Sequence, residues 1–308
     1  MAKRQALSRV IIPFTLLAVF LAVVGGSFAA LTFFDGGQRT GRCTASGFET
    51  ERSYSTEQTL NAATITAISI DMRLPPRAAS IALATAYQES KLKNIDYGDR
   101  DSVGLFQQRP SQGWGTEEQI MDPVYASTAF YEKLAKVKGY EKMEITVAAQ
   151  KVQRSAFPDA YGDHELEGRL FASALTGQSG PELECDLALA GGPAHPENVR
   201  KALAREFPRL TESGEVSSSL GSAGKDSPDG AGATTVVIRP GDERRGWALA
   251  NWAVAHAASE NIVGVDYREK RWDRSRHVSK DSSQWSSDAT GGDGAQSDAV
   301  VIYFAKGA

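Results

Sequence analysis

The feature that most constrains this chain is an uncharged stretch near its N-terminus. Val10–Phe34 runs for 25 residues without a charged side chain, and a helix needs about 20 apolar residues to cross a bilayer. Lys3 and Arg4 precede this stretch, and Asp35 ends it. Because basic residues stay on the cytoplasmic side, we expect residues 1–35 to form an anchor in the cytoplasmic membrane, with the rest of the chain extracytoplasmic.

A cleavable signal peptide is the alternative interpretation of the same segment. Ser27–Ala29 offers small residues at suitable relative positions for cleavage. The apolar run is longer than the roughly 7–15 residues typical of a signal peptide, which favours the anchor. With cleavage, the protein would be secreted, so both interpretations exclude a cytosolic protein.

The charge balance argues against one class of partner. The chain has 34 basic and 38 acidic residues and a formal net charge of −4. It therefore lacks the overall positive field that neutralises phosphates, and we expect no nucleic acid partner.

Two cysteines, Cys43 and Cys185, are the only ones in the chain. In an oxidising compartment they are expected to form one disulfide. The closed loop of about 140 residues would stabilise the fold by about 5 kcal/mol in the chain-entropy model. Two buried free thiols are the alternative.

Composition and periodicity divide the exported part into segments. Residues 36–56 lack periodicity and are expected to form a stalk, followed by a helical domain at 57–187 and a connector at 188–233. Within the connector, 15 of the 21 residues at 213–233 are Gly, Ser, Ala or Pro, which predicts a flexible linker. Residues 234–308 alternate strand-like and helical patterns and predict a small α/β module. The expected helices include 77–90, 124–136, 146–154, 166–175 and 247–259, and strands are expected at 234–238 and 299–304.

Glu89 ends the otherwise nearly uncharged helix at 77–90. At helical spacing it shares a face with Ala82, Thr85 and Ala86. Contact with this small, apolar wall would raise the pKa of the carboxyl group towards the range of a general acid. The alternative is a solvated glutamate at a helix end.

The surroundings of Glu89 resemble a known family. Glu89–Ser90 is followed, after a short polar loop, by Gly104–Leu105–Phe106–Gln107. This two-part pattern resembles that of goose-type lysozymes and soluble lytic transglycosylases. The resemblance covers about residues 57–175 and is to the secreted, actinobacterial members of this group. The resemblance implies a lysozyme-like α-helical fold that cleaves peptidoglycan between N-acetylmuramic acid and N-acetylglucosamine. It makes Glu89 the general acid, Ser90 the residue that orients it, and Gly104 and Gln107 part of the sugar groove.

Further candidates lie around this motif. Asp99, within a Gly-Asp-Arg context that is similar to that of goose-type lysozymes, is the candidate second catalytic carboxylate, and Asp101 is a second candidate in the same loop. Trp114, between two glycines, is a candidate groove-edge aromatic. Where transglycosylases usually have Ala-Tyr-Asn, this chain has Val147–Ala148–Ala149 followed by Gln150. Gln150 is therefore the candidate hydrogen-bond donor in place of a tyrosine, and hydrolysis is slightly favoured over transglycosylation.

Other chemistry receives little support from the residues. The four histidines are dispersed, so we expect no metal site, and no cofactor is indicated. The predicted fold class is a mainly α lysozyme-like domain after an N-terminal transmembrane helix, with a small C-terminal α/β module whose ligand the residues do not indicate. The predicted function is an extracytoplasmic peptidoglycan glycosidase acting by hydrolysis or lytic transglycosylation. A catalytically silent cell-wall-binding or scaffolding protein with the same groove is the alternative.

Overall fold

A computed structural model describes residues 39–154, 158–222, 233–276, 283–287 and 298–305. The predicted membrane anchor lies outside these residues. Among the described residues, no helix has both the length and the apolar character needed to cross a bilayer. Thr40–Ala308 form one compact unit.

A small antiparallel sheet opens this unit. Strands β1 (Arg42–Gly47) and β2 (Thr50–Ser55) form a hairpin, and β3 (Leu183–Asp186) pairs with the other edge of β1. Cys43 and Cys185 lie directly opposite each other in the β1–β3 register and form a disulfide, with their Cα atoms 3.9 Å apart. The predicted disulfide is confirmed.

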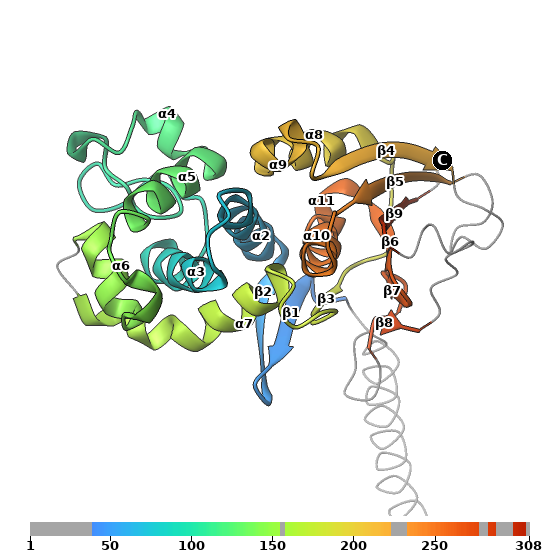
Figure 1. Cartoon of the computed structure of the whole chain (residues 1–308), viewed down its shortest axis with the longest axis horizontal. Coiled ribbons are helices and arrows are strands. Elements are labelled where there is room, and N and C mark those ends of the chain that lie inside the picture. Colours follow the sequence, from blue (N-terminus) through green and yellow to red (C-terminus); the bar gives the residue numbers. More distant parts are fainter. Residues whose placement is uncertain (1–38, 155–157, 223–232, 277–282, 288–297, 306–308) are drawn as a thin grey trace, which may run out of the picture. The chain divides into compact units, whose positions relative to one another are not determined.

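Helix α3 is largely buried, and the helices α2, α5, α6 and α7 lie around it (Figure 1). Ser55 caps α2 through a capping box with Gln58, and Pro76 opens α3, where its missing N–H is tolerated. Gly168 lets α7 approach α3 closely, because a Cβ atom there would lie 2.7 Å from the Ser80 carbonyl oxygen. The helices of this region are α2 (Thr56–Asp71), α3 (Pro76–Ser90), α4 (Glu117–Ile120), α5 (Pro123–Leu134), α6 (Ile145–Gln153) and α7 (Glu165–Leu175), with 3-10 helices η1 (Pro110–Gln112), η2 (Tyr140–Lys142) and η3 (Pro158–His164).

A second antiparallel sheet contains six strands in the order β4-β5-β9-β6-β7-β8. Helix α10 packs against this sheet on one side and contacts α2 and α7 on the other (Figure 1). Asn251 of α10 donates hydrogen bonds to the carbonyl oxygens of Ala174 (2.9 Å) and Gly180 (2.8 Å). The strands are β4 (Ser217–Ser222), β5 (Thr234–Arg239), β6 (Ile262–Tyr267), β7 (Lys270–Asp273), β8 (Trp285–Ser286) and β9 (Val300–Phe304), and the helices are α8 (Pro196–Glu206), α9 (Pro208–Glu212), α10 (Glu243–Ala255) and α11 (Ala257–Glu260).

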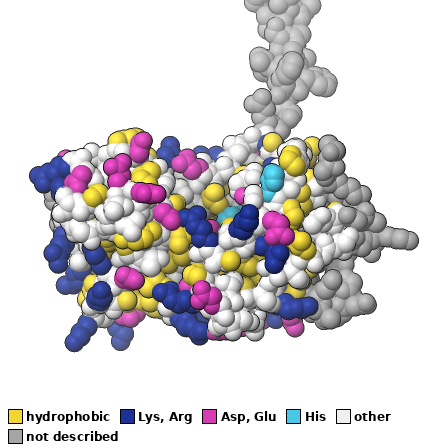
Figure 2. Space-filling view, turned by 90° about the horizontal axis from the view of Figure 1, so that it is seen from above, with side chains coloured by type: hydrophobic (Ala, Val, Ile, Leu, Met, Phe, Trp, Pro, Cys, Tyr) yellow, Lys and Arg dark blue, Asp and Glu magenta, His cyan; other side chains and the backbone are white. Residues whose placement is uncertain are grey.

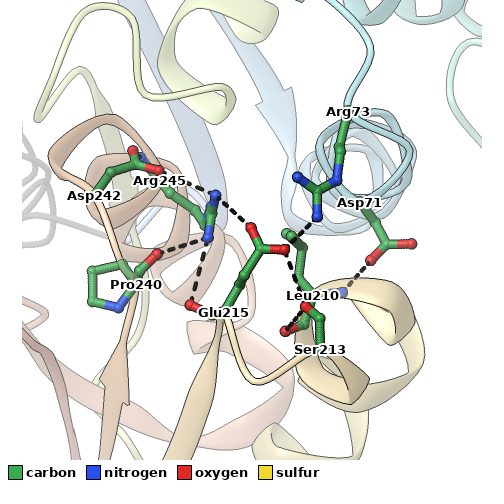
Figure 3. Close-up of polar contacts among 8 residues, drawn as sticks. All are labelled: Asp71, Arg73, Leu210, Ser213, Glu215, Pro240, Asp242 and Arg245. Atoms are coloured by element: carbon green, nitrogen blue, oxygen red, sulfur yellow. Dashed lines mark hydrogen bonds and ion pairs between the residues drawn. The ribbon is translucent and has the colours of Figure 1, made fainter.

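Polar contacts also tie the end of α2 to the chain after α9. Figure 3 shows Glu215 between two arginines: it pairs with Arg73 just after α2, and its other oxygen lies 3.4 Å from Arg245 of α10. Asp71, which is buried, accepts a hydrogen bond from the backbone N–H of Leu210 at 3.0 Å. Helix α9 and Glu215, which follows it, are therefore held against the end of α2, and Glu215 is also held against α10.

The predicted fold class is wrong. The strands form two antiparallel sheets, and the first includes β1 and β2 in the segment expected to be a stalk. Residues of the C-terminal sheet and of the N-terminal helices belong to one continuous hydrophobic core, so the described residues do not form a mainly α domain with a separate small α/β module. Strand β4, which has a serine-rich sequence, forms by pairing with β5 within the tract expected to be a flexible linker.

Candidate active site

Glu89 reaches the site from the last turn of α3. Its Oε1 atom accepts a hydrogen bond of 2.6 Å from the Tyr161 hydroxyl and a longer one of 3.3 Å from Gln153 Nε2. Burial raises the pKa of Glu89 above its usual value, and the two hydrogen bonds offset part of this shift because they favour the carboxylate. A carboxyl group in this setting can hold a proton at higher pH than a solvated glutamate can.

Two residues that contact Glu89 were not predicted from the sequence. Tyr161 is buried and lies in η3, and Gln153 is the last residue of α6. Gln153 Nε2 also donates to the carbonyl oxygen of Phe106 at 2.7 Å, so one side chain connects the carboxyl group to the Gly104–Gln107 motif. The sequence predicted Gln150 as the hydrogen-bond donor in place of a tyrosine, whereas in the structure a tyrosine from another part of the chain, Tyr161, donates to Glu89.

Ser90 contacts the motif loop rather than the Glu89 carboxyl group. Its hydroxyl donates to the carbonyl oxygens of Leu105 (2.8 Å) and Ala86 (3.0 Å). Ser90 therefore fixes the loop against the end of α3.

The backbone of the motif loop requires particular residues. Gly104 has φ +78°, and a Cβ atom there would lie 2.8 Å from the Ile120 carbonyl oxygen, so glycine is needed for both reasons. Gln107 also has positive φ, at 48°, and its side chain donates to the carbonyl oxygens of Tyr97 (3.2 Å) and Gly104 (3.3 Å). These contacts fix the conformation of the motif loop.

A cleft of about 460 Å³ opens at Glu89. Its lining is polar and includes several of the predicted residues together with side chains that were not predicted. The residues lining this cleft are Glu89, Asp99, Arg100, Ser102, Gln107, Arg109, Gln112, Trp114, Gln153 and Arg154. We call it the acid cleft.

The two candidate aspartates differ in their surroundings. Asp99 lines the acid cleft, but its side chain is 90% exposed and its ion pair with Arg100 is 3.9 Å long. Asp101 accepts hydrogen bonds from Arg109 Nε (2.7 Å) and the backbone N–H of Ser111 (2.8 Å). The Ser111 backbone N–H and the Arg109 guanidinium group hold the pKa of Asp101 well below its usual range. Asp101 therefore anchors the loop, whereas among the described residues the Asp99 carboxylate has only its 3.9 Å ion pair with Arg100.

The two remaining candidates, Trp114 and Gln150, differ in their relation to the acid cleft. Trp114 is largely buried but still lines the acid cleft, and Lys133 Nζ lies 3.0 Å from the centre of its indole ring. Gln150 lies about one helical turn before Gln153 on α6 and does not line the acid cleft as described. In the described part of the chain, no group of three or more His, Cys, Asp or Glu side chains is arranged to hold a metal ion.

Comparisons with known proteins add no assignment, because neither a family model nor a curated protein matches this chain. The chemistry of the site must therefore be inferred from its geometry. A partly buried carboxyl group, held by a phenol and an amide at the wall of an open polar cleft, can donate a proton to a bound molecule and take one back.

Proposed function

We propose that the protein cleaves the glycan strands of peptidoglycan outside the cytoplasmic membrane, with Glu89 as the proton donor. The observation that carries the proposal is the environment of Glu89: burial raises its pKa, while Tyr161 and Gln153 fix its position at the edge of the acid cleft. The Cys43–Cys185 disulfide supports an extracytoplasmic location, since disulfides persist in oxidising compartments.

In the first step, protonated Glu89 donates its proton to the glycosidic oxygen between N-acetylmuramic acid and N-acetylglucosamine. The bond from C1 of the muramic acid to this oxygen breaks, and the N-acetylglucosamine leaves with a hydroxyl group. As Glu89 becomes a carboxylate, the hydrogen bonds from Tyr161 and Gln153 strengthen, because the acceptor is now charged. General acid catalysis of this kind contributes about 10²–10⁴-fold to a rate.

We further propose that the second step is intramolecular. The Glu89 carboxylate accepts the proton of the muramic acid 6-hydroxyl, and O6 forms a bond to C1, which leaves a 1,6-anhydro end. This lytic transglycosylation needs a single carboxylate. Hydrolysis by inversion needs a second one about 6.5–9.5 Å from the acid to activate water. Asp99 is the candidate for that role, but its 90% exposure and weak contact with Arg100 do not fix it in position.

The test compares muropeptide release by the full-length chain and by Glu89→Gln. The variant keeps the size of the side chain but cannot deliver a proton, so release is expected to fall at least about 100-fold. Binding to insoluble peptidoglycan should persist in the variant. Equal rates of release would refute the role of Glu89. Binding without release by either protein would favour the non-catalytic wall-binding function instead.

A further inference from the structure

A second hollow of about 610 Å³ adjoins the acid cleft. Four residues line both, so the two spaces are neighbours that share a wall made of Gln112, Trp114, Gln153 and Arg154. The residues lining the second hollow are Gln112, Trp114, Lys133, Lys136, Val137, Lys151, Val152, Gln153 and Arg154. We call it the basic hollow.

The charge of the basic hollow differs from that of the general surface. Over the face seen in Figure 2, basic and acidic side chains lie intermixed. The basic hollow has four cationic side chains and no acidic one in its lining. They come in pairs three residues apart: Lys133 and Lys136 at the end of α5, and Lys151 and Arg154 at the end of α6.

Placement at helix ends explains part of this arrangement. Cations near a helix C-terminus interact favourably with the helix dipole. That effect does not require the ends of α5 and α6 to direct their cations towards the same space. Within the described residues, none of the four cations makes an ion pair with a carboxylate.

Three of the four charges are close enough for two of them to affect the third. Burial, together with the positive charges of Arg154 and Lys136, lowers the pKa of Lys133. Lys133 also lies against the Trp114 ring, a contact that favours the cation. An anion in the basic hollow would offset the repulsion between these cations, so the arrangement is complementary to a ligand that carries more than one negative charge.

We propose that the basic hollow binds the carboxylates of the peptide attached to the glycan strand. This inference rests on the proposed function, in which the glycan itself occupies the acid cleft. Each muramic acid bears a peptide as a side branch. A space that shares four lining residues with the acid cleft is close enough to receive a branch of the bound strand. The protein would then prefer strands that carry peptides over strands that lack them.

Binding to insoluble peptidoglycan tests this without requiring turnover. The protein is the full-length chain with Glu89→Gln, and the peptidoglycan is first treated with hydrofluoric acid to remove polymers joined by phosphodiesters. Half of it is then amidated with carbodiimide and ammonia, which neutralises carboxylates and keeps the peptides. We expect binding to the amidated half to be about tenfold weaker.

Charge-removing variants locate the effect. The test variant adds Lys136→Gln and Lys151→Gln, both at exposed positions, to the Glu89→Gln chain. It should bind the half that was not amidated about tenfold more weakly, and the difference between the two halves should disappear. The matched control carries Lys138→Gln and Lys142→Gln, which remove the same charge from exposed positions outside the basic hollow. The control should keep the difference.

Three outcomes would overturn the inference. Binding that is unaffected by amidation would exclude the carboxylates, and equal losses in the test and control variants would show a general charge effect. A further sample of peptidoglycan is left without acid treatment; if binding depends on Lys136 and Lys151 in that sample alone, the ligand is a phosphate-containing polymer and not the peptide. Failure of the proposed function is separate, since it would appear as absence of muropeptide release by the chain with Glu89 intact.

Discussion

The Tyr161 hydroxyl lies 2.6 Å from Glu89 Oε1 although 72 residues separate the two in the chain. Tyr161 comes from η3 and Glu89 from the end of α3, and these two elements pack against each other. The hydrogen bond joins the proposed proton donor to a group that favours its charged form. The sequence predicts Gln150 in place of a tyrosine beside the acid, but a tyrosine is present there.

Replacing Tyr161 with phenylalanine tests this contact. A hydrogen bond to a charged group contributes about 1.5–3 kcal/mol, so the maximal rate of muropeptide release is expected to fall roughly 10- to 100-fold. In the unmodified chain the hydrogen bond from Tyr161 lowers the pKa of Glu89. Its removal should therefore raise the pKa of Glu89 in the variant. The alkaline limb of the pH–rate profile should therefore move to higher pH. In the control, Tyr140→Phe, the profile should stay in place, and an unmoved limb in Tyr161→Phe would contradict the assignment.

The raised pKa of Glu89 also predicts how stability depends on pH. The folded protein holds the proton above pH 4.5, the ordinary value for glutamate, where the unfolded chain has lost it. The free energy of unfolding should thus fall as pH rises from 4.5 through the folded pKa. Glu89→Gln removes this dependence and is expected to melt at a higher temperature than the unmodified chain at pH 7. Thermal melts of both proteins from pH 4 to 8 measure the difference, and a lower melting temperature for the variant at pH 7 would contradict the prediction.

Asp99→Asn separates the two modes of cleavage. Because Asp99 is 90% exposed and weakly held, we expect release within about twofold of normal and products with 1,6-anhydro ends. Asp101→Asn is the comparison, since it weakens contacts with Arg109 and Ser111 and should reduce activity by disordering the loop. Mass spectrometry of the products decides the matter. Reducing ends without anhydro sugars, lost together with activity in Asp99→Asn, would establish hydrolysis.

The disulfide is expected to stabilise the fold strongly. It joins residues 142 positions apart, and in the chain-entropy model a loop of this length contributes about 5 kcal/mol. Replacing Cys43 and Cys185 with serine should lower the melting temperature by roughly 10–20 °C. Reduction of the unmodified chain should produce a similar loss, whereas the serine variant should not respond to reductant.

A buried pair between Glu206, the last residue of α8, and His256, which follows α10, predicts a second pH dependence. Burial alone lowers the pKa of His256, but Glu206, 3.4 Å away, outweighs it with help from Glu260, and the pKa is raised above 6.5. The pair's contribution to stability should be complete below pH 6.5 and lost as pH rises through the folded pKa. Glu206→Gln also weakens the acceptor of the Trp252 indole hydrogen bond.

For Glu206→Gln we expect a loss of about 3–5 kcal/mol at pH 6, because breaking a buried pair leaves one member without compensation. The loss should shrink at higher pH. Denaturant unfolding at pH 6 and pH 9 measures it, with the exposed Glu212→Gln as the control. An equal loss at both pH values would show that His256 carries no charge in the folded protein.

Several local features could be predicted from the sequence alone. The helix expected at 77–90 corresponds to α3, and those at 124–136, 146–154 and 166–175 correspond to α5, α6 and α7 with small shifts of their ends. The strands expected at 234–238 and 299–304 correspond to β5 and β9. These elements depend on residues near one another in the chain, such as the prolines that begin helices and β-branched runs. The pairing of the only two cysteines was equally accessible.

The tertiary structure decided what depends on distant partners. Ser217–Ser222 has the composition of a linker, yet it forms β4 because β5 supplies a ladder of backbone hydrogen bonds. The sequence around Glu89 indicates a proton donor at a helix end, but it gives no sign that Tyr161 and Gln153 will contact the carboxyl group. Long-range contacts of this kind follow from packing of a whole core, in which α3, α6 and η3 meet. Local composition and periodicity do not predict that packing, because they depend only on residues that are close together in the chain.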